Sequence, residues 1–209
     1  MISFKNRIFL LTLLTAVLIL NGCSKSEPAD PVPIETFQMV PSSDDVEDYL
    51  ELLEEYEEET DQWFQVTSKE IRDKYDIRIF KSDTTCSSLL LYEGELYPLG
   101  PCLGGYGVTS FAVADLNEDG AFELYFTCSW GSGIPRSEIG YFDSAEKETV
   151  MFDASYWMQE LLLEADDSDL LCVYDAKASV NSFVDIEMSP EEKVGSVAFS
   201  SGTIRFFED

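Results

Sequence analysis

The chain has 209 residues, enough for one domain with a substantial core or at most two small ones. It carries 13 lysines and arginines against 41 aspartates and glutamates, a formal net charge of −28 at pH 7, and it has no histidine. The charge argues against binding to nucleic acid and to anionic lipid, and it favours divalent cations. The lack of histidine excludes Ser–His–Asp and Cys–His catalysis and every metal site that needs an imidazole.

The N-terminus has the organisation of an export signal. Lys5 and Arg7 precede an apolar run at residues 8–20, which is short for a membrane span and suits a signal peptide. The run ends in Leu20-Asn21-Gly22-Cys23, which resembles the lipobox of bacterial lipoproteins. The resemblance implies cleavage before Cys23, lipidation of its sulfur, and anchoring to the outer face of a bacterial membrane. The alternative is an ordinary cleaved signal with an incidental cysteine.

These features predict three parts of the chain. Residues 1–22 are a signal peptide, and residues 23–42 are the lipidated cysteine followed by a proline-rich tether. Residues 43–209 form a single domain.

Two helices are predicted at the start of this domain. In residues 44–63 the apolar side chains recur at three- and four-residue spacing, opposite an acidic face, with Ser43 as the N-cap. The second helix runs from Thr67 to Lys74, with Thr67 as N-cap and Glu70 completing a capping box.

From Ile77 onward the pattern is typical of strands separated by short polar links. The tail is predicted to hold strands at 170–174, 183–188, 194–199 and 203–207, whereas residues 155–164 fit a helix slightly better than a strand. The expected fold is therefore α+β, an antiparallel β-meander sheet with the N-terminal helices packed on one face.

The most informative stretch is an acidic loop within residues 111–128. Asp115, Asn117 and Asp119 stand at alternate positions, Gly120 follows, and Glu123 comes three residues later. Short oxygen side chains on a glycine-closed turn can converge on calcium, which takes six to eight oxygen ligands. An EF-hand is excluded, because its twelfth position would be Phe126 and the flanking residues favour strands.

This loop resembles the calcium loop of FG-GAP/VCBS repeats, in which the acidic motif lies between strands. The resemblance implies that Ca²⁺ is held by the side chains of Asp115, Asn117, Asp119 and Glu123 and by the carbonyl of Ala121. The motif occurs once, so it does not support the propeller that arrays of such repeats build. The alternative is a solvated hairpin turn, since Asn, Asp and Gly are turn residues in any case.

Four cysteines remain after Cys23, an even number that permits two disulfides in an exported protein. A three-residue hairpin loop at Glu93-Gly94-Glu95 would place Cys86 opposite Cys102, which leaves Cys128 and Cys172 to pair by elimination. The alternative is that all four are reduced, small apolar residues.

Residues 129–136, SWGSGIPR, leave the acidic hairpin as a glycine-rich loop. Trp130 and Arg136 are of the residue types that dominate binding hot spots, so they are a candidate recognition loop; the alternative is that Trp130 packs on the core. Two functions compete. The first is a lipid-anchored, calcium-stabilised binding or accessory lipoprotein without catalytic activity, whose partner is a protein or glycan. The second is a small histidine-free hydrolase that uses paired carboxylates.

Overall fold

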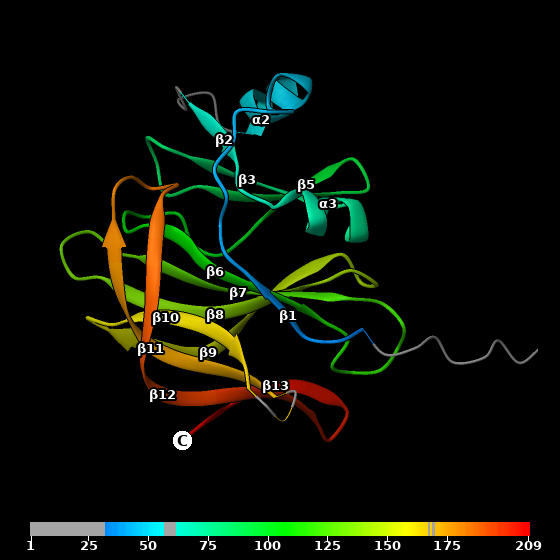
Figure 1. The fold of residues 1–209 in the computed structure, drawn as a ribbon, viewed down its shortest axis with the longest axis vertical. Helices are drawn as coiled ribbons and strands as arrows, with labels where there is room; N and C mark the ends of the chain where they lie inside the picture. The colour runs from blue at the N-terminus through cyan, green and yellow to red at the C-terminus, as the bar shows by residue number, and fades with distance from the viewer. Residues whose placement is uncertain (1–31, 57–61, 167, 169) are drawn as a thin grey trace, which may run out of the picture. The chain divides into compact units, whose positions relative to one another are not determined.

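A computed structural model describes residues 32–56, 62–166, 168 and 170–209 of the chain (Figure 1). Of these, 54% lie in strands and 10% in helices, and the strands form three antiparallel sheets. The predicted α+β fold, one meander sheet with N-terminal helices on one face, is therefore wrong, and the protein is mostly β. The predicted signal peptide, Cys23 and the tether as far as residue 31 lie outside the described residues.

The three sheets follow one another along the chain. The N-terminal sheet has the order β2-β3-β4-β5, with β2 (Trp63–Gln65), β3 (Arg78–Ser82), β4 (Ser88–Tyr92) and β5 (Glu95–Pro98). The central sheet has the order β1-β6-β7-β8-β9, with β1 (Glu35–Phe37), β6 (Gly107–Ala114), β7 (Glu123–Trp130), β8 (Arg136–Asp143) and β9 (Glu148–Trp157). The C-terminal sheet has the order β10-β11-β12-β13, with β10 (Glu160–Ala165), β11 (Leu171–Val180), β12 (Ile186–Ser200) and β13 (Thr203–Glu208).

The middle strands of the central sheet, β6 and β7, are buried on both faces. Along β7, Leu124, Phe126 and Cys128 enter one hydrophobic cluster, which includes Ile79 and Leu90 of the N-terminal sheet. Tyr125 points the other way, into a second cluster. This second cluster contains Leu163 and Val173 of the C-terminal sheet. Because successive side chains of a strand point to opposite faces, one hairpin supplies the middle of both cores.

The helix predicted at 44–63 is found in part. Among the described residues of this segment, η1 (Glu47–Tyr49) and α2 (Leu50–Tyr56) are helical, whereas Trp63 begins strand β2; residues 57–61 lie outside the described residues. The N-cap position, Val46, makes no side-chain capping bond. Repulsion between acidic residues four apart on the outer face also opposes a longer helix.

The second predicted helix is present as α3 (Lys69–Tyr75), but its cap differs. Ser68, rather than Thr67, is the N-cap, and its side chain accepts from the amide of Ile71. The Thr67 hydroxyl is buried and instead accepts from the amide of Ile79, at 2.7 Å. A tertiary contact has therefore displaced the local capping box.

The segment at 155–164 is extended rather than helical. Strand β9 continues to Trp157, Met158 turns the chain at a φ of 61°, and β10 begins at Glu160. Leu161 and Leu163 are both buried in the second cluster, which is the period of two expected of a strand. A short apolar run fits either period, and burial against the central sheet decided this one.

The described part of the predicted tether takes part in the fold. Strand β1 pairs with β6, so that Thr36 lies opposite Ala112, and Ser42 forms a bridge with Gln65. None of the helices in the described ranges is long and apolar enough to cross a membrane.

Lys81 of β3 is fully buried between the N-terminal sheet and the start of β6. Its ammonium donates to the carbonyls of Tyr106, at 2.9 Å, and Val108, at 2.6 Å. No carboxylate forms an ion pair with it among the described residues. Burial therefore lowers the pKa of Lys81 from 10.5 to about 7.

This burial makes stability depend on pH in a known direction. Between pH 7 and 10.5 the folded protein has released the Lys81 proton whereas the unfolded chain keeps it, so raising the pH favours folding. We expect the free energy of unfolding of the wild type, relative to Lys81→Met, to rise by on the order of 3 kcal/mol between pH 7 and pH 10. Urea unfolding at a series of pH values measures it.

The matched control is Lys177→Met, since Lys177 is exposed on β11. The difference in the free energy of unfolding between Lys177→Met and the wild type should stay constant as the pH rises. A constant difference for Lys81→Met as well would mean that the buried amine keeps its proton.

Candidate functional site

The acidic loop joins β6 to β7, as the sequence pattern predicts. Asp115 directly follows the last residue of β6, and Glu123 is the first residue of β7. The chain reverses through Glu118 and Gly120, whose φ angles are 58° and 88°. Glycine adopts such a φ at little cost, which explains its place in the turn.

Side-chain oxygens fold this loop by accepting its backbone amides. The two carboxylate oxygens of Asp115 accept from the amides of Asp119, at 3.1 Å, and Gly120, at 3.0 Å. Asn117 Oδ1 also accepts from the Asp119 amide, and Asp119 Oδ1 accepts from the Ala121 amide. The bonds of Asn117 and Asp119 reach two residues along the chain, as in Asx turns, whereas those of Asp115 reach four and five residues and close the loop.

Three carboxylates converge in this loop. One oxygen each of Asp115, Asp119 and Glu123 lie within 4.8 Å of one another. Asp115 is 6% and Glu123 1% exposed, whereas Asp119 faces solvent. Among the described residues no lysine or arginine forms an ion pair with any of them. Buried charge without a counter-ion is costly, and a bound cation would remove that cost.

Glu123 is the member most affected by burial. Its Oε2 accepts from the Leu116 amide and from the Tyr125 hydroxyl, each at 3.0 Å. Burial raises the pKa of Glu123 to about 7, and the two hydrogen bonds only partly offset it; the carboxylates of Asp115 and Asp143 add to the increase. The ionised form of Glu123 therefore lacks enough positive charge around it.

The predicted ligands are not equally placed. Asp115, Asp119 and Glu123 come together, whereas the Asn117 amide nitrogen donates to Asp119 Oδ2 at 3.0 Å and Ala121 contributes its amide to Asp119. Two neighbours were missed by the sequence reasoning, Tyr125 and Asp143. Asp143 lies opposite Glu123 in the β7–β8 register, which no local pattern in the sequence reveals.

The donors at this turn suit a hard cation. Every candidate ligand atom is a carboxylate, amide or carbonyl oxygen, the donor type that calcium and magnesium prefer. The carboxylates stand on a loop held by two strands of the core, so their positions are set before a cation arrives. The residues present therefore fit a hard divalent cation, without distinguishing calcium from magnesium.

The candidate recognition residues lie at the opposite end of β7. Trp130, Arg136 and Trp157 face one another across β7, β8 and β9. The Arg136 guanidinium carbon is 4.9 Å from the ring centre of Trp130 and 3.8 Å from that of Trp157. Trp130 is partly buried against the first core cluster, whereas Trp157 is 53% exposed. The more accessible ring of the pair is thus one that the sequence did not single out.

Other exposed apolar side chains lie beside this stack. Leu103, Ile134 and Met158 are each more than half exposed. Backbone bonds join their segments, from the Gly131 amide to the Leu103 carbonyl and from the Met158 amide to the Pro135 carbonyl. We call Leu103, Trp130, Ile134, Arg136, Trp157 and Met158 the aromatic end of the central sheet.

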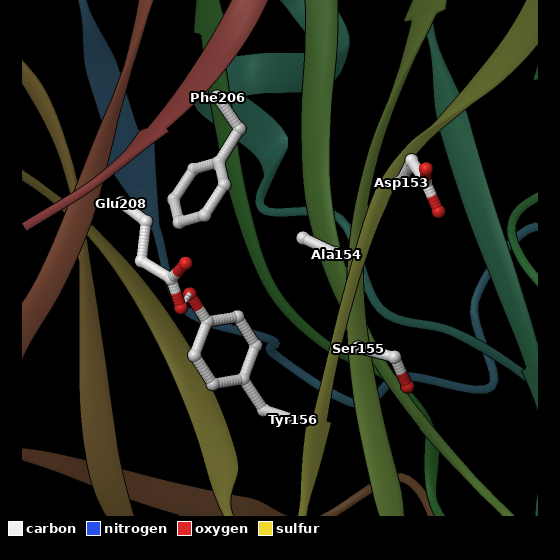
Figure 2. Close-up of a pocket in the computed structure, with 6 residues that line it drawn as sticks. All are labelled: Asp153, Ala154, Ser155, Tyr156, Phe206 and Glu208. Atoms are coloured by element: carbon white, nitrogen blue, oxygen red, sulfur yellow. Dashed lines mark hydrogen bonds between the residues drawn. The ribbon is translucent and has the colours of Figure 1, made fainter.

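A separate pocket lies between the edge strands β9 and β13 (Figure 2). Its volume is about 340 Å³, and it is lined by Asp153, Ala154, Ser155, Tyr156, Phe206 and Glu208. The Tyr156 hydroxyl donates to Glu208 at 3.2 Å. In Figure 2 the Asp153 carboxylate points away from Glu208, so these two acids do not converge as an acid–base pair would.

Comparison of the chain with family models, with curated proteins and with solved structures found no significant match.

The contribution of the stacked Arg136 side chain to the free energy of unfolding can be measured. Replacing Arg136 with Met removes two cation–π contacts and should lower the free energy of unfolding by about 1 kcal/mol. In a Trp157→Leu background the same change should cost clearly less, because one ring is already absent. Urea unfolding of the four proteins measures the difference.

Arg205→Met is the matched control, since Arg205 is exposed on β13 and has no ring contact of this kind among the described residues. It should cost less than about 0.5 kcal/mol. Equal effects of Arg136→Met in both backgrounds would show that Trp157 does not hold the guanidinium.

Proposed function

We propose that this protein is an exported, lipid-anchored binding or accessory protein without catalytic activity, whose fold is stabilised by calcium in the loop between β6 and β7. The observation that carries the proposal is the convergence of Asp115, Asp119 and Glu123 within 4.8 Å, two of them buried, with no cationic side chain paired to them in the described part of the chain.

Calcium would act here as a structural ion. The loop connects the two strands that supply the middle of both hydrophobic cores, so a cation bound to it stabilises the most buried hairpin. A ligand that binds only the folded state stabilises it in proportion to the logarithm of its concentration over its dissociation constant. Extracellular calcium modules bind at roughly 0.1–1 mM, which suits a protein outside the cell.

We expect 10 mM calcium to raise the melting temperature of the wild type by about 3–10 °C, and magnesium to raise it much less. The double variant Asp115→Asn with Asp119→Asn should lose this shift. Asparagine keeps one acceptor oxygen, so position 119 can still accept the Ala121 amide and position 115 can still accept one of its two amides, while two ligand charges are removed. Differential scanning calorimetry after treatment with a chelator measures the shift.

The surface is strongly acidic, so a general cation effect must be separated from a specific one. Glu187→Gln with Glu191→Gln removes the same charge from exposed positions of β12 and should retain the calcium shift. If both double variants gain as much stability from calcium as the wild type, the loop is only a turn.

The proposed location rests on the sequence of the N-terminus. The lipobox-like Leu20-Asn21-Gly22-Cys23 follows an apolar run, and lipidation at Cys23 with two acyl chains would give stable anchoring where one would not. The outer face of a bacterial membrane is also where millimolar calcium is available.

Cys23→Ser should move the protein from the detergent-rich phase to the aqueous phase in detergent partitioning of whole cells. The wild type and Cys172→Ser, which changes a cysteine of the folded part, should both stay in the detergent-rich phase. Unchanged partitioning of Cys23→Ser would exclude a lipid anchor at this residue.

The aromatic end of the central sheet is the surface that suits a protein or glycan partner. Tryptophan and arginine are enriched in binding hot spots, and Arg136 has no ion-pair partner among the described residues. The net charge of −28 makes nucleic acid an unsuitable partner. No specific observation favours the alternative of a carboxylate hydrolase, because the acids of the β9–β13 pocket point apart.

A further inference from the structure

Two thiols lie side by side where the N-terminal sheet meets the central sheet. Cys86 is in the connection between β3 and β4, and Cys102 is in the connection between β5 and β6. Their sulfur atoms are 3.0 Å apart as free thiols. The predicted three-residue hairpin loop is not the cause, because Tyr92 pairs with Glu95 and the turn has two residues.

The backbones around these cysteines are held together without the sulfurs. The Leu99 amide donates to the Ser88 carbonyl at 2.9 Å, and the Val108 amide donates to the Ser88 hydroxyl at 3.1 Å. Gly107 lies against Cys86, since a Cβ on that glycine would be 2.2 Å from the Cys86 carbonyl oxygen. The two thiols are therefore positioned by the fold, and a covalent bond between them needs only a small approach of the sulfurs.

We propose that Cys86 and Cys102 are a modification site, which forms an intramolecular disulfide by exchange with a small disulfide oxidant. The thiolate of Cys102 attacks one sulfur of the oxidant and releases its first thiol. The thiolate of Cys86 then attacks Cys102 Sγ and releases the second. Two S–H bonds are lost and one S–S bond is formed, while the oxidant is reduced to two thiols that take up both protons.

The order of the two steps follows from access. Cys102 is exposed and can meet the oxidant, whereas Cys86 is buried. Burial, aided by the neighbouring Cys102 thiol, also raises the pKa of Cys86 to about 12, which disfavours it as the first nucleophile.

A disulfide between Cys86 and Cys102 would restrain the connection between β5 and β6, which packs on the aromatic end. After Cys102 the Tyr106 amide donates to the Ser129 carbonyl at 3.1 Å, and a Cβ on Gly105 would be 2.5 Å from the Trp130 Cα. This connection contains Gly100, Gly104 and Gly105, all at positive φ, so the unfolded chain is especially free there. A disulfide between Cys86 and Cys102 reduces the conformational entropy of the unfolded chain and restrains the segment that packs on the end of β7.

The other two cysteines make different contacts. Cys128 packs in the first core cluster, and its sulfur would lie 2.6 Å from a Cβ placed on Gly100. The Cys172 thiol faces Asp166 at 3.8 Å in the C-terminal sheet. The pairing of Cys128 with Cys172, predicted by elimination, is not present, since Cys128 lies in the first core cluster and Cys172 in the C-terminal sheet. Cys128 is therefore the competing thiol that an experiment must distinguish.

The test uses the full chain in detergent, treated with oxidised glutathione and then alkylated under denaturing conditions. Cleavage after Glu93, Glu95 and Glu123 places Cys86, Cys102 and Cys128 on separate peptides. Mass spectrometry should find the Cys86 and Cys102 peptides linked, and reductant should separate them. Reduction should also lower the melting temperature by about 6–12 °C, a fall that Cys102→Ser should not show.

Cys128→Ala and Cys172→Ala are the matched controls, and both should keep the linked peptides. Alkylation of both Cys86 and Cys102 after the glutathione-treated wild type is denatured would overturn the proposal, and so would a link from Cys86 to Cys128. The test is independent of the proposed function, because it needs neither the lipid nor calcium. Repeating it in chelator and with the Asp115→Asn, Asp119→Asn variant should give the same link.

Discussion

The structure depends on the burial of the β6–β7 hairpin on both faces. All eight residues of β6 are buried, and so are all of β7 except Trp130. Polar residues of the hairpin must then find partners inside the protein. The Thr127 hydroxyl donates to the Leu161 carbonyl at 2.9 Å, and it accepts from the hydroxyls of Thr109, at 3.0 Å, and Ser110, at 2.6 Å. These bonds join the central sheet to β10 of the C-terminal sheet.

The same hairpin explains where the unusual side chains lie. Strand β7 begins at Glu123, in the acidic loop, and ends at Trp130, at the aromatic end. Burial in the core forces Glu123 and Asp115 out of water, and this makes a cation favourable at that turn. At the other end Trp130 at the end of β7, Arg136 at the start of β8 and Trp157 at the end of β9 stack on one another, with Trp130 against the core and Trp157 exposed. One buried strand thus separates a charged end from an aromatic end.

Local sequence patterns predicted the elements in which the residue types and their spacing indicate the same secondary structure. The strand–loop–strand unit around Asp115 and the strand character of the C-terminal tail were read correctly, because β-branched and aromatic residues alternate with turn residues there. The helix predicted at 44–63 is confirmed over Glu47–Tyr56 but not at Trp63, which begins β2. The slight preference for a helix at 155–164 was wrong, because a period of three or four can also describe short strands packed on a sheet. Thr67 lost its capping role to a hydrogen bond with Ile79, a residue twelve positions away.

The candidate sites likewise combine features that the sequence determined with features that only the tertiary structure decided. The sequence by itself determined the oxygen-rich loop, the absence of histidine chemistry and the acidic surface, because these depend on residue type and on spacings of a few positions. Only the tertiary structure decided that Glu123 is buried beside Tyr125 and faces Asp143, that Trp157 completes the stack on Arg136, and that Cys86 meets Cys102. Strand register and sheet order bring these residues together, and both are set by packing between distant segments rather than by neighbours in the chain.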